Sequence, residues 1–123
     1  MVSSSNLQQR DLEARSKQFA VQVARVVFAL PEGRRTEVLV KQLLRAATAV
    51  GANYRSACHA KSRADFIAKM SIAEEEADEV QYWLELMVEL DLLDQETFKR
   101  LHREAQELTA IFVASGKTAK ANR

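Results

Sequence analysis

The stretch SRADFIAKMSIAEEEADEVQYWLELMVEL, residues 62–90, decides the fold of this chain. Its apolar positions recur at alternating intervals of four and three residues, a spacing that places them on one face of an α-helix. Ser62 precedes the first of them, and the acidic Asp65 follows three residues later, a pattern typical of a capped helix start. The sequence therefore predicts a long amphipathic helix, and its core face consists of Phe66, Met70, Ala73, Ala77, Val80, Leu84 and Met87.

Three more segments carry apolar residues at helical spacing. The first runs from residue 6 or 11 to Leu30, the second covers about residues 34–60, and the last follows Asp94 and ends at Gly116. Pro31 separates the first two, because proline disfavours the α conformation in the residue before it. Four helices with short connections predict an all-α, antiparallel up-down-up-down four-helix bundle. The expected core faces of these three segments are Leu12, Ser16, Phe19, Val23, Val26, Val27 and Leu30; Leu39, Leu43, Ala46, Val50, Tyr54 and Ala57; and Phe98, Leu101, Ala105, Leu108 and Phe112.

These patterns also predict how the chain is divided. We expect the bundle to span residues 11–116, with residues 1–10 a flexible N-terminal segment or helix extension and residues 117–123 a disordered basic tail. Gly51 lies inside a predicted helix, where glycine costs about 1 kcal/mol relative to alanine. It therefore predicts a close helix crossing, and the alternative is a tolerated exposed glycine.

Composition restricts the class of protein. The chain has 123 residues, of which 47% are hydrophobic, with only three glycines and one proline, so it is long and apolar enough for one domain with a true core. No apolar stretch approaches the roughly 20 residues of a membrane span, and we expect no membrane partner. The single cysteine, Cys58, allows no intramolecular disulfide and favours a cytoplasmic protein.

The residues of catalytic and metal sites are missing from the predicted helices. Two-metal sites in bundles use Glu-x-x-His pairs, but Ser56 and Lys99 stand three residues before His59 and His102. We therefore expect no metal, no cofactor and no enzymatic activity. Cys58 is expected to be an inert, partly buried thiol rather than a nucleophile activated by the neighbouring histidine.

Charge is distributed very unevenly along the chain. The net charge of +1 combines +6 over residues 1–61, −8 over residues 62–94 and +3 over residues 95–123. Within the acidic run of residues 74–79, only Glu76 lies near the core face. We expect it to pair with an arginine of the 34–60 segment rather than with a metal ion.

A basic stripe lies on the outward face of the 34–60 segment and extends beyond its ends. Such a strip has the length and charge to follow a nucleic-acid backbone, and the alternative is an ordinary solvated helix face. Few aromatic residues accompany it, so phosphate or shape would be recognised rather than bases. The predicted nucleic-acid contacts are Arg34, Arg35, Lys41, Arg45, Arg55, His59, Lys61 and Arg63.

The 62–90 segment has more apolar surface than one core face can bury. Outward apolar residues beside acidic ones suggest a subunit interface. Contact between an acidic face and a basic face of identical subunits is heterologous and closes into a ring when the rotation permits. We therefore expect a cyclic homo-oligomer whose interface includes Glu75, Glu79, Tyr82, Trp83 and Leu86.

Three parts of the sequence, QLLRAATAVGANYR at residues 42–55, SRADFIAK at 62–69 and EADE with YWL at 76–84, resemble the family of 23S rRNA intervening-sequence proteins. The accessory protein of diversity-generating retroelements is a distant member of the same fold group. The resemblance implies a homopentameric ring of four-helix bundles, with some relatives encoded inside ribosomal RNA insertions and others associated with a reverse transcriptase and nucleic acid. The chain departs from the family in having Ser56 where glutamate is common and Glu75 where lysine is common. It occupies the motif positions at Asn53, Tyr54, Arg55, Asp65, Phe66, Lys69, Glu76 and Trp83.

Three functional hypotheses follow from these observations. The first is a non-catalytic, ring-forming bundle that binds structured RNA or DNA through its basic face. The second is a scaffold that binds another protein and has no nucleic-acid role. A third, a bundle that holds a small molecule or metal, needs inward polar ligands that the helical stripes do not contain.

Overall fold

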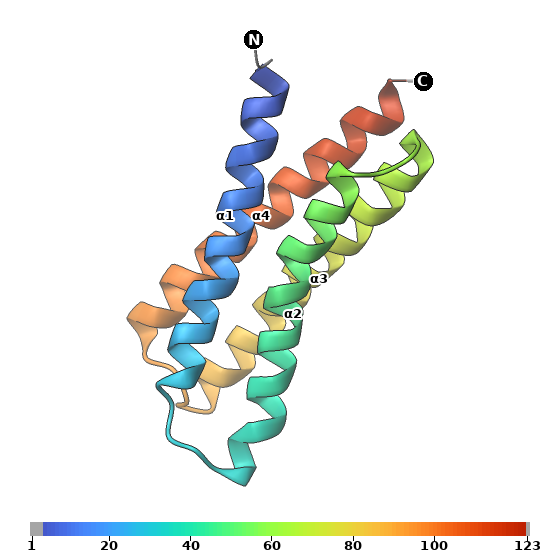
Figure 1. Ribbon diagram of the computed structural model, residues 1–123. Coiled ribbons are helices and arrows are strands. Elements are labelled where there is room, and N and C mark those ends of the chain that lie inside the picture. Colours follow the sequence, from blue (N-terminus) through green and yellow to red (C-terminus); the bar gives the residue numbers. More distant parts are fainter. Residues whose placement is uncertain (1–3, 123) are drawn as a thin grey trace.

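The chain folds into four α-helices, and the computed structural model describes residues 4–122, with their side chains from Gln8 onward. Helix α1 covers Ser4–Phe28, α2 Arg34–Cys58, α3 Arg63–Glu89 and α4 Gln95–Ala121, and no strand occurs within residues 4–122. Figure 1 shows the two termini at one end of the bundle and the α1–α2 and α3–α4 connections at the other. The predicted all-α four-helix bundle is confirmed.

The helix boundaries follow from local hydrogen bonding. Ser62 Oγ accepts a hydrogen bond of 3.0 Å from the backbone N–H of Asp65 at the start of α3. Asp94 caps α4 in the same way, accepting from the Thr97 N–H at 2.7 Å. Both side chains satisfy amide groups that have no partner inside the helix. Helix α3 ends before Asp91, whose φ of 59° lies in the left-handed region.

The core consists of the predicted faces of all four helices. From Met70 to Met87 every predicted position of α3 is at most 1% exposed, and Phe66 and Phe98 are half-buried against the same core. The pattern did not identify two buried residues, Ala47 beside the α2 stripe and Leu93 in the α3–α4 connection. The helical period of 3.6 residues therefore identified nearly all of the core. Leu93 was missed because it lies in a connection, where no periodic pattern exists.

Helix α1 is attached to the bundle differently from the others. It packs mainly on α2 and touches α4 sparsely, whereas α3 packs extensively on both α2 and α4. At Gly51 of α2, an added Cβ would lie 3.3 Å from the carbonyl carbon of Ser16 in α1. This confirms the predicted close crossing. The main polar tie from α1 to α4 is Arg15, whose guanidinium lies 2.7 Å from Glu104 and 2.9 Å from Glu107.

The two ends of the chain differ in how well they were predicted. Helix α1 begins at Ser4, in agreement with the helix-extension alternative, and residues 1–3 lie outside the described residues. The expected stop at Gly116 is wrong, because α4 continues to Ala121 and residues 117–121 of the predicted disordered tail are helical. A single glycine costs a helix only about 1 kcal/mol, which the good helix formers around it offset. Arg123 lies outside the described residues.

Replacing Gly116 by alanine tests this helical end directly. No atom lies within 4 Å of the position of an added Cβ at Gly116, so the substitution meets no steric resistance. We expect Gly116→Ala to raise the free energy of unfolding by about 0.5–1 kcal/mol, as measured by urea denaturation. A lower stability than that of the wild type would contradict a helix that continues through this residue.

Candidate nucleic-acid interface

The predicted basic residues are all exposed, but they do not form one patch. Arg34 and Arg55 stand 21 residues apart on α2, about 31 Å along the helix axis. Only Arg55 and His59 line the same cavity, whereas Arg34 lines another at the opposite end of the helix. Lys61 and Arg63 lie on the α2–α3 connection and at the start of α3. The exposed set is Arg34, Arg35, Lys41, Arg45, Arg55, His59, Lys61 and Arg63.

Arg45 pairs within the bundle. Its guanidinium lies 2.9 Å from the carboxylate of Glu76 and also binds Glu79, both on α3. The predicted arginine partner of Glu76 is thereby confirmed. Glu79 also accepts a hydrogen bond of 3.0 Å from Trp83 Nε1. Its side chain is half-buried, whereas the sequence pattern placed it outward. Arg45 and Glu79 therefore hold α2 to α3.

The two carboxyl groups that bind Arg45 have opposite pKa shifts. Burial raises the pKa of Glu76 above its usual value, and the hydrogen bond from Arg45 only partly opposes this. The same arginine lowers the pKa of the more exposed Glu79. The Glu76 side chain is only 14% exposed, so its negative charge depends on the nearby guanidinium.

Removal of this arginine is expected to destabilise the fold. Arg45→Met leaves the partly buried Glu76 carboxylate without its partner, which we expect to lower the free energy of unfolding by about 1–2 kcal/mol at pH 7. A group whose pKa is raised in the folded state loses its destabilising charge as pH falls, so the deficit should shrink toward pH 5. Urea denaturation at both pH values measures the effect. In Lys41→Met, which removes only an exposed pair with Glu37, the change should stay within about 0.5 kcal/mol.

A groove between α1 and α2 is lined by cations that have no ion-pair partner among the described residues. It encloses about 700 Å³ and is lined by Arg10 and Lys17 from α1 and by Arg55 and His59 from α2. Glu13 is the one acidic residue in its lining. Its remaining lining residues are small: Ala14, Ala20, Thr48, Gly51 and Ala52.

Sequence reasoning missed the α1 half of this groove. Arg10 and Lys17 are seven residues apart and share the exposed side of α1, a signal visible in the sequence. Their proximity to Arg55 depends on the antiparallel packing of α1 on α2. Gly51 permits that packing, because the α1 backbone passes within van der Waals contact of it.

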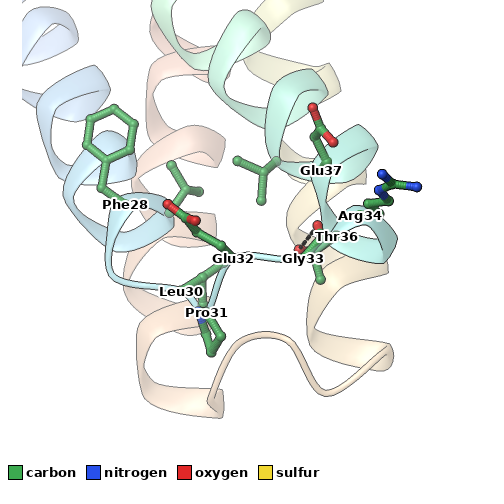
Figure 2. Close-up of a pocket in the computed structure, with 10 residues that line it drawn as sticks. Phe28, Leu30, Pro31, Glu32, Gly33, Arg34, Thr36 and Glu37 are labelled. Atoms are coloured by element: carbon green, nitrogen blue, oxygen red, sulfur yellow. Dashed lines mark hydrogen bonds between the residues drawn. The ribbon is translucent and has the colours of Figure 1, made fainter.

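A second cavity, of about 780 Å³, lies at the turn between α1 and α2. Figure 2 shows Phe28 and Glu32 on one side of it and Arg34, Thr36 and Glu37 on the other. Phe28 is 74% exposed. This cavity has mixed charge and an apolar wall, and it therefore differs from the cationic groove.

The predicted oligomer interface is partly exposed. Tyr82 is 58% exposed and meets Trp83 edge-on, with 5.0 Å between the ring centroids. Glu75 is exposed, while Leu86 and Trp83 are half-buried. The structure therefore leaves Tyr82 and Glu75 available for contact.

Most family-motif positions make intramolecular contacts. Asn53 donates to the Ala49 carbonyl at 2.8 Å, Tyr54 stacks on Phe112 at 5.5 Å, and Lys69 lies 3.2 Å from Asp65. Phe66 packs on the core, and Glu76 and Trp83 belong to the network around Arg45 and Glu79. Arg55 is the exception, because it lies exposed in the cationic groove.

The side chains suited to other chemistry are dispersed. Among residues with described side chains, no group of three or more His, Cys, Asp or Glu is placed to hold a metal ion. Cys58 is partly buried, and burial raises the pKa of its thiol to about 11, so the unreactive protonated form prevails at neutral pH. Within residues 4–122, none of the helices combines the length and apolar character needed to cross a membrane.

Comparison with known proteins adds family information to this geometry. The family model described as 23S rRNA-intervening sequence protein matches residues 9–114. A protein of unknown function from the S23 ribosomal protein family of Bacteroides thetaiotaomicron, known from its crystal structure, is 35% identical with a TM-score of 0.81. That similarity covers 86% of this chain and 98% of the other. No curated protein matches the chain.

Proposed function

This chain belongs to the 23S rRNA-intervening sequence protein family, and from that membership we propose that it is a non-catalytic, ring-forming cytoplasmic protein that binds structured RNA or DNA. The observation that carries the proposal is the α1–α2 groove. Arg10, Lys17 and Arg55 line it with only one acidic residue and no ion-pair partner among the described residues, and His59, whose Nδ1 donates to the Arg55 carbonyl at 2.9 Å, completes the polar lining. Clustered cations without partners are the electrostatic signature of a polyanion site.

The groove suits the phosphate backbone rather than the bases. No aromatic side chain except His59 lines it, so there is no platform for base stacking, and alanine, glycine and threonine complete its lining. Arginine and lysine bind phosphate oxygens through charge-assisted hydrogen bonds that do not depend on sequence. We therefore expect recognition of backbone shape with little sequence preference.

Ring formation is the second part of the proposal. Helix α3 carries eight acidic and two basic residues, whereas the basic groove lies on α1 and α2. Unlike faces on one subunit make heterologous contacts, which close into a ring when the rotation permits. A cyclic homopentamer is the assembly that family membership suggests.

A salt titration tests the nucleic-acid part of the proposal. Binding of a fluorescent RNA hairpin and of a DNA hairpin is measured by anisotropy between about 50 and 200 mM salt. Release of counterions by three cations should give a slope of log K against log salt of about −2 to −3. Absence of binding at the lowest salt, by protein that is shown to be folded, overturns this function.

The alternative is a scaffold that binds another protein and no nucleic acid. One observation favours it: Phe28, in the lining of the cavity of Figure 2, is 74% exposed, and Val38 of α2 is 65% exposed. Pull-down from the native host with and without nuclease separates the two functions. A protein partner retained after nuclease treatment and lost in Phe28→Lys favours the scaffold.

A further inference from the structure

The outward face of α3 forms a continuous acidic stripe. Its members follow each other at intervals of three and four residues, so they lie on one side of the helix, and every one of them is exposed. Tyr82, in the middle, is the only aromatic residue among them. Of the acidic members, only Glu85 has a side-chain partner among the described residues, since its carboxylate lies 2.9 Å from His102 Nε2. The acidic stripe consists of Glu75, Asp78, Tyr82, Glu85 and Glu89.

The α1–α2 groove has complementary charge and a lining of small residues. Gly51, Ala52 and Ala14 line it without bulk, and small residues let another helix approach closely. Arg10, Lys17 and Arg55 supply positive charge around them. A helix that fits this groove would present acidic residues with one large side chain between them, and the acidic stripe has that composition.

We propose that the α1–α2 groove of one copy receives the acidic stripe of α3 from a second copy, so that subunit assembly and nucleic-acid binding exclude one another at that groove. This inference rests on the proposed function, because it assigns both activities to the same cations. The stripe and the groove are different surfaces of one subunit, and their contact is therefore heterologous and propagates around a ring. Tyr82 is the central anchor, and the acidic side chains pair with the arginines and lysine of the groove.

A regulatory consequence follows from the shared groove. The acidic stripe acts as an internal competitor, because it offers the groove the same negative charge that a phosphate backbone offers. Nucleic acid then binds only to grooves that no neighbour occupies. Its apparent affinity equals the affinity of a free groove multiplied by the fraction of grooves that are free. An RNA present in excess should convert assembled protein into smaller protein–RNA complexes.

Reversing charges on each surface separates assembly from nucleic-acid binding. The stripe variant is Glu75→Lys with Asp78→Lys, and the groove variant is Lys17→Glu with Arg55→Glu; all four residues are free of ion pairs among the described residues. Light scattering behind a sizing column gives the mass of each protein with and without an RNA hairpin. Asp11→Lys with Glu32→Lys, two exposed residues outside both surfaces, is the control with the same change in charge.

The expected results differ for each protein. Wild type should be an oligomer that RNA dissociates, and the stripe variant should be a 13.9 kDa monomer that binds RNA about tenfold more tightly than the control. The groove variant should be monomeric and should bind RNA about 100-fold more weakly than wild type. The chain with all four substitutions should assemble again, because the charges are exchanged, and its RNA binding should stay as weak as that of the groove variant.

Two results would overturn the inference while the proposed function stands: a stripe variant with the mass of the wild-type oligomer, or RNA that adds to the intact wild-type oligomer. A groove variant that binds RNA as tightly as wild type overturns both the assignment of nucleic-acid binding to the groove and this inference, because the shared cations are its premise, whereas absence of RNA binding by folded wild-type protein and by the stripe variant overturns the proposed function itself. A monomeric wild type at high concentration overturns both the ring and this inference.

Discussion

Reversal of two charges in the α1–α2 groove, Lys17→Glu with Arg55→Glu, is expected to weaken binding of an RNA hairpin about 100-fold at low salt. Each substitution removes a cation and places a carboxylate beside Glu13, so the groove changes from mostly basic to mostly acidic. Loss of these two phosphate contacts should also reduce the magnitude of the salt slope by about 2. Anisotropy titrations at several salt concentrations measure both quantities.

The control for this prediction is a reversal of two cations on another helix. Arg100→Glu with Arg103→Glu makes the same change in net charge on α4, where both residues are exposed and without an ion pair among the described residues. We expect the affinity of this control for the RNA hairpin to fall about threefold or less, because long-range attraction between charges is screened beyond about 10 Å. Equal losses in the two proteins would assign binding to net charge rather than to the groove.

Replacement of Gly51 by leucine is expected to lower the free energy of unfolding by about 3 kcal/mol. A Cβ at Gly51 already lies 3.3–3.4 Å from backbone atoms of Ser16 and Lys17, and backbone cannot rotate away as a side chain does. The larger leucine side chain must push α1 off α2. That displacement exposes Phe19 and Val23, which are at most 1% exposed in the bundle.

Gly116→Leu is the matched control, since this glycine is also helical but has no atom within 4 Å of an added Cβ. We expect urea denaturation to show Gly116→Leu at least as stable as wild type. Gly51→Ala should fall between the two, because about 1 kcal/mol of helix propensity opposes a contact that is too short by a few tenths of an ångström. A Gly51→Leu protein of wild-type stability would show that α1 does not pack closely on α2.

The periodic segments made most of the fold predictable. The core face from Met70 to Met87 and the caps at Ser62 and Asp94 were all readable, because each depends on neighbours within one helical turn or on a regular repeat. The pairing of Glu76 with an arginine of α2 was predictable for a related reason. A carboxylate near the core requires a cation, and the α2 stripe offered few candidates.

The candidate site was predictable only in part. The α2 stripe was correctly placed on the surface, but Arg45 turned out to bind Glu76 and Glu79 within the bundle. The cations that line the groove beside Arg55 are instead Arg10 and Lys17, which lie far from it in the sequence. Which charges pair internally and which remain free depends on the distances between helices, and no periodic pattern within one helix contains that information.

By itself, the sequence determined the four helices, their buried faces and the family to which the chain belongs, because helix formation and amphipathicity are local properties of neighbouring residues. Only the tertiary structure decided which cations remain without partners and where they meet. The close crossing at Gly51 brings α1 against α2 and forms the groove from two helices, while the packing of α3 on α2 neutralises Arg45. Coulomb interactions depend on separation in space, and that separation is set by the packing of side chains between helices.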